Sequence, residues 1–430
     1  MPEPIRVLHI ITRMVKGGAQ ENTLANVLGF SAPGWECSLA TGPALGPEGS
    51  LEPECLAAGV RMLRIPELVR ELSPFQDLRA VQRLIRLCQK ERPHIVHTHT
   101  SKAGILGRIA ARRAGVPIVV HTPHGHVFHS YGSQIKTKVF IGAERHCAPM
   151  ADRLVALTPN ERQEHLELGV GRVADWSIVH SGINFEPFEA GRAERRAARK
   201  ELGLTDETPV IGTVGRLVPI KGQRYLIDAF ARLASQGSRA HLLLVGDGEL
   251  RDELLDDCYG RGLRVVKHYS RELPPKLEVH ESWEPTVHFV GLRRDVPRLM
   301  SAMDLFTLPS LNEGMGRVLV EAMAMELPCV ASRVSGIPDV VLDGETGCLV
   351  APRDPEALAN ALSMLLADPR RAQAMGRRGR ERVVPEFGAG RMLEKLEGIY
   401  RELLRAKGIA VPVDHPNIET VGQEIASRPG

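Results

Sequence analysis

The sequence contains the same transition from strand through glycine to helix twice, once in each half of the chain. In the first half, the apolar run from Ile5 to Ile11 leads through Gly17 and Gly18 into the amphipathic segment ENTLANVLG. In the second half, PVIGTVGRL leads through a glycine loop into KGQRYLIDAFARLAS. A buried strand followed by a helix is the repeating unit of parallel α/β sheets, so the two transitions predict two such domains.

Further segments continue this alternation along the chain. Strand-like runs such as HIVHTH and IVVHTP alternate with helix-like segments such as FQDLRAVQRLIRLCQKE. With 430 residues the chain is too long for one ordinary hydrophobic core. We therefore predict two tandem doubly wound α/β domains that face a ligand cleft.

The domain boundaries follow from changes in the sequence pattern. Residues 1–185 form the predicted N-terminal domain and residues 209–385 the C-terminal domain. The segment 186–208 is charged and lacks strand patterning, so we predict an inter-domain linker. Residues 386–408 have apolar residues at helical spacing and predict a long helix, whereas residues 409–430 predict a weakly ordered tail.

Composition excludes several classes of protein. Hydrophobic residues make up 43% and charged residues 25% of the chain, and no apolar run approaches the ~18 residues of a membrane span. The N-terminus leads directly into a strand, so we expect a cytoplasmic protein. The seven cysteines form no CxxC pair, which argues against a disulfide scaffold or a zinc site. A net charge of +3 is too small to indicate a nucleic-acid partner.

One stretch departs from this even charge pattern. Between Pro93 and Ala143 the sequence has no Asp or Glu, while Lys and Arg occur at Lys102, Arg108, Arg112, Arg113, Lys136 and Lys138. One interpretation is a solvated basic face. The other is a surface for a diphosphate-bearing acceptor or for anionic lipid headgroups, which would place the protein peripherally on the cytoplasmic face of the inner membrane.

The segment from Leu308 to Val341 holds two glutamates eight positions apart, Glu313 and Glu321. The pattern predicts a buried strand, LFTLPS, followed by the loop LNEGMG and a helix. Such a loop lies at the carboxyl edge of a parallel sheet, where open α/β folds bind ligands. The N–H groups at the helix start attract anions, while carboxylates accept hydrogen bonds from hydroxyls. The segment therefore indicates a ligand with a phosphate at one end and hydroxyl groups at the other.

A second loop in the same half carries two cations. Arg216 and Lys221 lie five positions apart in GRLVPIKGQ, around a turn that ends at a helix start. Arg offers a planar fork and Lys a point charge, so the two could clamp a diphosphate. The sequence has no GxGxxG or Walker-type phosphate loop, which disfavours nicotinamide and ATP sites.

Histidines gather around two successive predicted strands, at His94, His97, His99, His121, His124, His126 and His129. The HxH spacing is compatible with a metal site, but no carboxylate or cysteine lies in this stretch to complete a catalytic metal shell. We predict no metal site and interpret these side chains as uncharged groups lining a polar cleft. His124, just past a strand end, is best placed to reach that cleft.

These segments together resemble the retaining nucleotide-sugar glycosyltransferases of family 4, which have the GT-B fold. The resemblance covers nearly the whole chain, from VLHIITRMVKGGAQ through HTHTSKAGILGRIAARRAGVPIVVHTPHGH and VGRLVPIKG to DLFTLPSLNEGMGRVLVEAMA. Its most specific elements are the E-x7-E pattern of Glu313 and Glu321 together with Arg216 and Lys221. The first half is most similar to bacterial enzymes that build exopolysaccharide, capsule or surface glycans.

The resemblance implies two Rossmann-like domains and a C-terminal helix that packs back on the N-terminal domain. It implies transfer of a sugar, with retention, from a UDP- or GDP-sugar to a lipid-linked or glycan acceptor. Such enzymes need no cofactor and no metal, because cationic side chains and a helix dipole stabilise the leaving diphosphate. A retaining outcome without an evident nucleophile fits front-face attack, in which the leaving phosphate takes the acceptor proton.

In the second half, the resemblance implies a role for each matching residue. Arg216 and Lys221 would neutralise the donor diphosphate, Glu321 would bind the ribose hydroxyls and Glu313 the hydroxyls of the sugar. The remaining donor contacts are implied for Val290, Gly291, Gly314, Met315 and Gly316.

In the first half, the resemblance places His124 beside the donor sugar near the reacting centre. Gly17 and Gly18 would keep their loop close to the diphosphate and the acceptor. His99 and His126 are assigned to the lining of the acceptor side.

Two alternatives remain open at this point. A nucleotide-sugar 2-epimerase has the same architecture and needs no acceptor, although the E-x7-E loop argues against it. A non-catalytic subunit that binds nucleotide sugar is the other, and for it we would expect loss of Arg216, Lys221 or Glu313.

The sequence also departs from the family pattern in two places. Glu326 stands where most relatives have a Gly, so we expect the left-handed cap of that helix to be made differently. An apparent insertion from Leu263 to Thr286, with a proline pair and many charges, predicts an exposed loop or hairpin.

Overall fold

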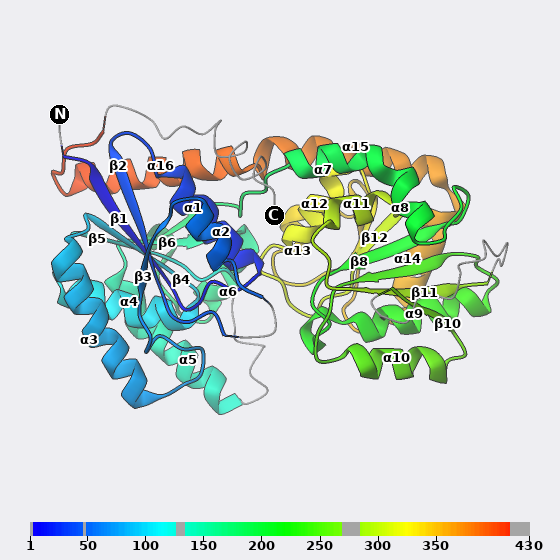
Figure 1. Cartoon of the computed structure of the whole chain (residues 1–430), viewed down its shortest axis with the longest axis horizontal. Coiled ribbons are helices and arrows are strands. Elements are labelled where there is room, and N and C mark those ends of the chain that lie inside the picture. The colour runs from blue at the N-terminus through cyan, green and yellow to red at the C-terminus, as the bar shows by residue number, and fades with distance from the viewer. Residues whose placement is uncertain (1–2, 46–48, 126–133, 269–283, 413–430) are drawn as a thin grey trace. The chain divides into compact units, whose positions relative to one another are not determined.

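The computed structural model describes residues 3–45, 49–125, 134–268 and 284–412. The chain forms two compact units, one of Met1–Gly182 with Phe387–Gly430 and one of Ile183–Glu386 (Figure 1). Each unit is a seven-stranded sheet with helices on both of its faces. The predicted α/β class with two Rossmann-like units is confirmed.

The sheet of the first unit has the strand order β3-β2-β1-β4-β5-β6-β7, and all its paired strands are parallel. Its strands are β1 (Ile5–Ile11), β2 (Trp35–Thr41), β3 (Arg61–Arg64), β4 (Ile95–His99), β5 (Ile118–Thr122), β6 (Arg153–Ala156) and β7 (Trp176–Ile178). The helices around it are α1 (Gly18–Gly29), α2 (Glu52–Ala57), α3 (Pro74–Glu91), α4 (Ser101–Arg113), α5 (Gln134–Cys147), α6 (Pro159–Glu167) and α16 (Ala389–Ala406). Short 3-10 turns, η2 (Ala148–Met150) and η3 (Val173–Asp175), complete the unit.

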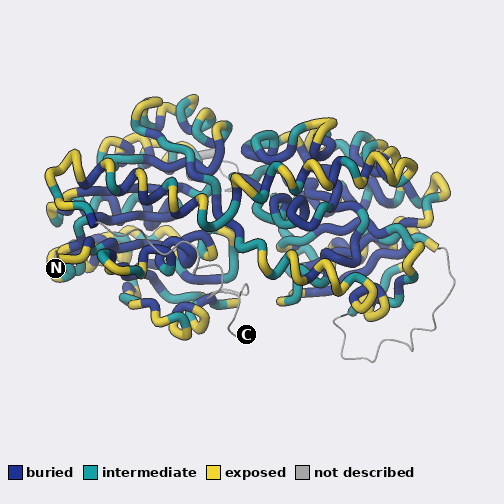
Figure 2. Tube along the Cα trace, turned by 90° about the horizontal axis from the view of Figure 1, so that it is seen from above, coloured by how far each residue is buried: buried dark blue, intermediate teal, exposed yellow. Residues whose placement is uncertain are grey.

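Side chains alternate between the two faces of this sheet, and each face has its own core. Val7 packs with Leu393 and Tyr400 of α16 on one face, whereas the next residue, Leu8, packs with Leu84 of α3 on the other. This period of two is the signature of a strand covered on both sides, and Figure 2 shows the strands as buried runs. The predicted return of the C-terminal helix to the N-terminal domain is confirmed.

The sheet of the second unit has the order β10-β11-β9-β8-β12-β13-β14, again with parallel pairs. Its strands are β8 (Val210–Val214), β9 (His241–Val245), β10 (Arg264–Lys267), β11 (Thr286–Gly291), β12 (Leu305–Leu308), β13 (Cys329–Ser332) and β14 (Gly347–Val350). Its helices are α7 (Glu186–Gly191), α8 (Arg195–Glu201), α9 (Gln223–Ser235), α10 (Arg251–Gly260), α11 (Val296–Ser301), α12 (Arg317–Ala324), α13 (Ile337–Val340), α14 (Pro355–Ala367) and α15 (Pro369–Glu386), with 3-10 turns η4 (Arg192–Glu194) and η5 (Pro219–Lys221).

The segment 186–208, predicted as a linker, folds as α7, η4 and α8 and belongs to the second unit. Arg199 of α8 is buried and donates a hydrogen bond of 2.7 Å to the carbonyl of Ala302. Asp304 accepts from Arg195 at 2.5 Å and also from the backbone N–H of Val210 at 2.8 Å. The charges of this segment therefore serve tertiary ion pairs, which the absence of strand patterning could not reveal.

The cap of α12 differs from the expectation. Glu326 itself adopts the left-handed conformation, with φ 63°, and the N–H of Leu327 bonds the carbonyl of Ala322 at 3.0 Å. The carboxylate of Glu326 pairs with Arg192 at 2.9 Å. The usual cap geometry is therefore kept without glycine, and the expectation of a different cap was wrong.

Two predicted features lie largely outside the described residues. Within the apparent insertion, β10 is a parallel strand beside β11, whereas residues 269–283 lie outside the described part. The predicted tail likewise lies outside it from residue 413 onwards. Among the described helices, none is both long and apolar enough to cross a membrane.

Candidate active site

In the second unit, the loops after β8 and β12 lie side by side because these strands are neighbours at the point where the strand order reverses. Such a reversal opens a crevice at the carboxyl ends of the strands. The N–H of Leu311 in the second loop bonds the carbonyl of Ile220 in the first at 2.8 Å. Gly222 has φ 67°, and a Cβ there would lie 2.1 Å from the carbonyl oxygen of Pro309. Only glycine permits this close approach.

This approach brings Lys221 and Glu313 into direct contact. The Lys221 Nζ donates to Glu313 Oε1 at 2.5 Å, and the Ser310 hydroxyl donates to the same oxygen at 2.8 Å. The two side chains remain 22% and 13% exposed. The sequence assigned these residues to different parts of a ligand, and the structure adds that they form one charge-assisted pair.

Several other predicted donor-binding residues lie on the same two loops or on α12. Arg216 is exposed on the β8 loop, and its carbonyl accepts a hydrogen bond of 2.8 Å from Gln223. Glu321 lies half-buried on α12, whose N-cap is Gly316 with φ 78°. Met315 is 2% exposed, so its side chain is buried in the interior. Gly314 is half-buried between Glu313 and Met315.

The predicted base-contact segment ends β11 at a glycine-lined edge. The ladder with β9 shifts register between Phe289 and Gly291, and the N–H of Gly246 bonds the carbonyl of Gly291 at 2.9 Å. Val290 is 2% exposed, so its side chain packs inward. Backbone groups at this edge are therefore what this segment can offer a ligand.

Sequence reasoning missed the residues that support the Glu313 loop. The Ser335 hydroxyl hydrogen-bonds Asn312 Oδ1 at 2.8 Å, and the N–H of Gly336 bonds the carbonyl of Glu313 at 3.2 Å. Ser335 adopts a positive φ of 44°.

In the first unit, His124 lies directly after β5 in the left-handed conformation, with φ 59°. Glu161, in the first turn of α6, accepts hydrogen bonds from the N–H of Gly125 at 2.6 Å and from that of Leu157 at 2.5 Å. Gly17 caps α1, and Gly18 is its first residue, as predicted. His126 lies outside the described residues. The loop that carries His124 is thus held by a buried carboxylate from a neighbouring helix.

His97, His99 and His121 do not line a cleft, which corrects the prediction for these three; His94 is half-buried and His129 lies outside the described residues. His9, His97, His99 and His121 are at most 1% exposed and lie within the sheet of the first unit. His97 bonds Tyr400 at 2.6 Å and Thr122 at 2.8 Å, while His99 bonds both His9 and His124 at 2.9 Å. His99, predicted to line the acceptor side, therefore stands behind His124.

These buried histidines are neutral. Burial lowers the pKa of His9 to about 3 and lowers the pKa values of His97 and His99 well below the usual range. The three rings also lie close enough together that one nitrogen from each could hold a metal ion. The expectation that the protein needs no metal stays a prediction.

Three cations of the acid-free stretch are paired with acids, whereas Arg113 and Lys138 are exposed, so the stretch is not a continuous basic surface and its membrane role stays a prediction. Arg108 is fully buried and pairs with Glu144 at 2.5 Å, and Lys102, 8% exposed, pairs with Asp77 at 2.6 Å. Arg112 pairs with Asp152 at 2.8 Å. The acidic partners come from outside the stretch, so a count of charges along the sequence could not find them. The side chain of Lys136 lies outside the described part.

Comparison with known proteins places this arrangement in a family. Residues 17–180 match the model described as a glycosyl transferase 4-like domain, and residues 208–368 match glycosyl transferases group 1. The UDP-Gal:alpha-D-GlcNAc-diphosphoundecaprenol alpha-1,3-galactosyltransferase of Escherichia coli is 30% identical over 347 residues, which cover 80% of this chain and 84% of the relative. The chain belongs to glycosyltransferase family 4. The capsular polysaccharide biosynthesis glycosyltransferase CapM of Staphylococcus aureus is 28% identical over 78% of this chain and 84% of its own length.

Solved structures confirm the GT-B fold of this family 4 member. Anabaena Alr3699/HepE in complex with UDP and glucose has a TM-score of 0.73 at 21% identity, covering 92% of this chain and 99% of that one. WaaG, a glycosyltransferase involved in lipopolysaccharide biosynthesis, has a TM-score of 0.69 at 18% identity, covering 91% and 99%. The protein is a glycosyltransferase of bacterial glycan synthesis, and the epimerase and non-catalytic readings are set aside.

Proposed function

We propose that this glycosyltransferase transfers a hexose, with retention, from a UDP-sugar to a sugar carried on a lipid diphosphate. The observation that carries the proposal is the Lys221–Glu313 pair at the reversal of the second sheet, beside exposed Arg216. The E. coli relative is named for UDP-Gal and for a diphosphoundecaprenol acceptor, and HepE binds UDP-glucose. A UDP-sugar is therefore favoured over the GDP-sugar that the sequence left open.

The proposed mechanism follows from where charge develops. Breaking the bond between the anomeric carbon and phosphate leaves an oxocarbenium-like sugar and adds negative charge to the diphosphate. Arg216, Lys221 and the N-terminus of α12 would stabilise that charge more in the transition state than in the bound substrate. Metal independence is part of this proposal, since two cationic side chains are available for the diphosphate. Turnover should then survive chelation with EDTA.

The pairing with Lys221 gives Glu313 a binding role. A carboxylate that already accepts from Lys221 and Ser310 is a hydrogen-bond acceptor for sugar hydroxyls and orients the lysine that faces the diphosphate. The leaving phosphate oxygen would take the acceptor proton on the same face. Glu313→Gln and Glu313→Ala should weaken use of the donor without trapping a glycosyl-enzyme. A covalent adduct on Glu313 in an intact-mass spectrum would contradict front-face attack.

Donor and acceptor can be tested together with labelled UDP- and GDP-sugars, each with and without a polyprenyl-diphosphate-linked sugar. Nucleotide release that requires both a UDP-sugar and the lipid acceptor supports the proposal. An epimerised donor, or binding without turnover, would restore one of the alternatives. The anomeric configuration of the product, measured by NMR, separates retention from inversion.

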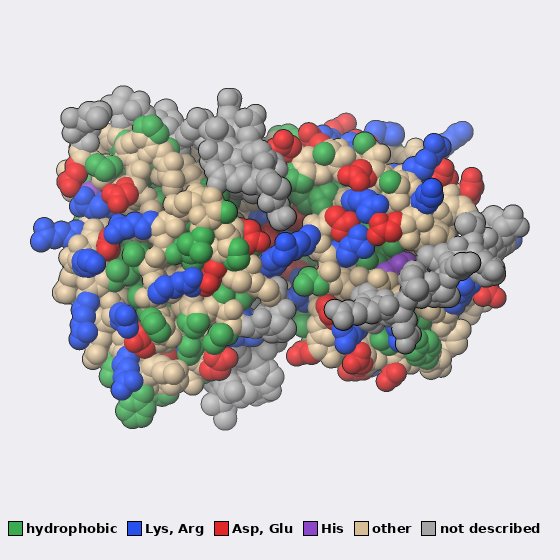
Figure 3. Space-filling view, in the orientation of Figure 1, with side chains coloured by type: hydrophobic (Ala, Val, Ile, Leu, Met, Phe, Trp, Pro, Cys, Tyr) green, Lys and Arg blue, Asp and Glu red, His purple; other side chains and the backbone are tan. Residues whose placement is uncertain are grey.

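The proposal includes docking on an anionic membrane, because the acceptor is a lipid. We assign this docking to α3, which carries more exposed cations on one face than the acid-free stretch does. Arg79, Arg83, Arg86 and Lys90 lie four, three and four positions apart and therefore share one helix face. Figure 3 shows Lys and Arg side chains gathered over the region of α3, with hydrophobic side chains at its lower end.

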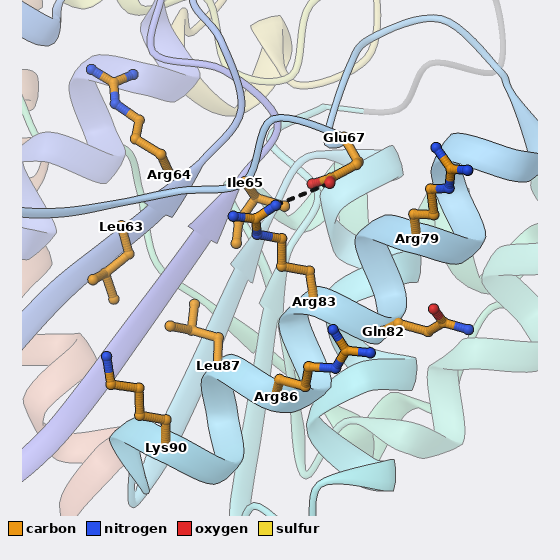
Figure 4. A pocket seen from close by; sticks show the side chains of 10 residues that line it. All are labelled: Leu63, Arg64, Ile65, Glu67, Arg79, Gln82, Arg83, Arg86, Leu87 and Lys90. Carbon is orange, nitrogen blue, oxygen red and sulfur yellow. Dashed lines mark hydrogen bonds and ion pairs between the residues drawn. The ribbon is translucent and has the colours of Figure 1, made fainter.

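Figure 4 shows these basic side chains around a groove of about 570 Å³ between α3 and β3. Arg83 reaches Glu67 at 3.0 Å, whereas Arg79, Arg86 and Lys90 have no acidic partner in the described part of the chain. Phe75, one turn before Arg79, is 83% exposed, and Leu72 and Leu78 are 53% and 55% exposed. Exposed apolar groups beside unpaired cations suit insertion between anionic headgroups.

Flotation with phosphatidylglycerol-containing vesicles tests this surface. Changing Arg79, Arg86 and Lys90 to Gln removes three charges and should weaken partitioning by about two orders of magnitude, at about 1 kcal/mol per residue. Neutralising Arg370, Arg371 and Arg377, which are exposed on α15 of the other unit, is the matched control and should leave partitioning unchanged. Equal loss in both variants, or no preference for anionic lipid, would contradict the assignment to α3.

A further inference from the structure

A continuous chain of three histidine rings runs from the core of the first unit to the loop after β5. His9 Nδ1 lies 2.9 Å from His99 Nε2, and His99 Nδ1 lies 2.9 Å from His124 Nε2. The ring centroids are 5.2 and 5.1 Å apart, with planes inclined by only 18° and 29°. Rings that meet edge to edge in nearly one plane have the geometry of N–H···N hydrogen bonds.

The row of hydrogen-bonded histidines ends at His9, inside the core. His9 and His99 are fully buried, and His9 Nε2 has no hydrogen-bond partner among the described residues. Both side chains are neutral because burial disfavours their charged forms. A neutral imidazole carries one N–H, so each ring can donate through one nitrogen and must accept through the other. The hydrogen bonds of the chain therefore all run in the same direction.

The two possible directions leave different groups unpaired in the core. If the bonds run outward, His9 donates to His99 and His99 donates to His124, which leaves a bare lone pair on His9 Nε2. If they run inward, His124 donates to His99 and His99 to His9, which leaves a buried N–H on His9 without an acceptor. Orphaned buried N–H groups are the rarer of the two defects in folded proteins. The outward direction is therefore favoured.

We propose that His9 and His99 are positioning residues that hold His124 in the tautomer with its proton on Nδ1. In that tautomer Nε2 accepts from His99, and Nδ1, the nitrogen outside the chain, is a hydrogen-bond donor. The Glu161 carboxylate, which holds the N–H of Gly125, fixes the backbone that carries this ring. A donor on His124 suits an oxygen of the sugar or of its phosphate, and this consequence rests on the proposed function and on the position beside the donor sugar that the family resemblance implies for His124.

The tautomer itself can be measured without any substrate. Ring-nitrogen NMR of the protein labelled at histidine, with the His124 signals assigned by their loss in His124→Gln, reports which nitrogen carries the proton. We expect Nδ1–H in the wild type. His99→Leu, which removes the donor, should give a mixture of both tautomers, while His99→Asn, whose side-chain amide can take the place of Nδ1–H, should restore the wild-type state. An Nε2–H signal in the wild type, or no change in His99→Leu, would overturn the proposal.

Kinetics then separate this proposal from the proposed function. His99→Leu should lower kcat about 10-fold or more, as loss of a supporting hydrogen bond commonly does, with a smaller change in KM, and His99→Asn should recover most of the loss. Tyr400→Phe is the control, because it removes a hydrogen-bond partner of His97 and leaves the hydrogen bonds among His9, His99 and His124 in place. If the wild type shows the Nδ1–H tautomer but His124→Gln has no kinetic effect, the role of His124 is contradicted. The hydrogen bonds among His9, His99 and His124 are then still supported.

A metal ion is the rival occupant of these histidines. Both ring nitrogens of His99 take part in hydrogen bonds, so its coordination of a metal ion would break the bond to His9 or the bond to His124. A divalent ion found at one equivalent per chain, and lost in His97→Asn, would overturn the hydrogen-bonded chain. Purified protein without bound metal and with the Nδ1–H tautomer supports it.

Discussion

At the scale of single residues, Lys221 shows how one contact can set both charge and position. Its ammonium group donates to Glu313 at 2.5 Å, and its side chain remains 22% exposed. Under the proposed mechanism, Lys221→Met should lower kcat by about 100-fold or more, because a preorganised cation for the leaving diphosphate is lost. Arg224→Gln, an exposed change in the next helix, should leave kcat unchanged. Equal kinetics for the two variants would show that Lys221 does not act on the reaction.

The buried pair Arg108–Glu144 is a residue-scale feature of stability. Arg108 is fully buried and its partner nearly so, at 2.5 Å. Arg108→Met should cost about 3–5 kcal/mol of unfolding free energy, since it leaves a buried carboxylate uncompensated. The double variant Arg108→Met with Glu144→Met should be more stable than the single one. Urea unfolding of the three proteins measures this, and additive losses would contradict the pairing.

At the scale of elements, the docking of α16 against α1 depends on a glycine. A Cβ at Gly29 would lie 2.4 Å from Leu393, so Gly29→Ala should cost about 1–3 kcal/mol through overpacking. Leu393→Ala should cost about 2–5 kcal/mol through the cavity it leaves. The two together should cost less than their sum, because the new methyl group occupies part of the vacated space. Gly398→Ala, on the same helix but facing open space, is the control and should be slightly stabilising. Strict additivity would contradict direct packing.

At the scale of the whole molecule, buried histidines link stability to pH. Burial lowers the pKa of His9 to about 3 and that of His241 to about 4, and it also lowers the pKa values of His97, His99 and His121. Below about pH 6.5 these histidines bind protons in the unfolded state but not in the folded state. Their contribution to the free energy of unfolding is therefore present above that pH and is lost as the pH falls. As the pH falls from about 6.5 towards its folded pKa, each such histidine should lower the free energy of unfolding by more than about 1 kcal/mol per pH unit.

This pH dependence can be followed in the first unit through Trp35 and Trp176, which are buried there. In a Trp283→Phe background, their fluorescence during urea unfolding should report a free energy that falls steeply between pH 6.5 and 5. His9→Leu should make the slope shallower by about one proton, because one buried base is gone. A slope that is the same with and without His9 would contradict its protonation on unfolding.

Local residue patterns were enough to predict the repeated α/β plan, the place of the glycine loops and the segment that carries Glu313 and Glu321. Strand and helix periodicity arises from residues a few positions apart, and a parallel sheet necessarily brings its loops to one edge. The tertiary structure alone decided which charges meet. Glu144 pairs with Arg108, Asp77 with Lys102 and Asp152 with Arg112, so half of the cations in a stretch without acids are paired in space. It likewise joined Lys221 to Glu313, and His9 through His99 to His124. Such contacts depend on how distant segments pack, and for the histidines on burial that keeps their rings neutral, which local pattern does not encode.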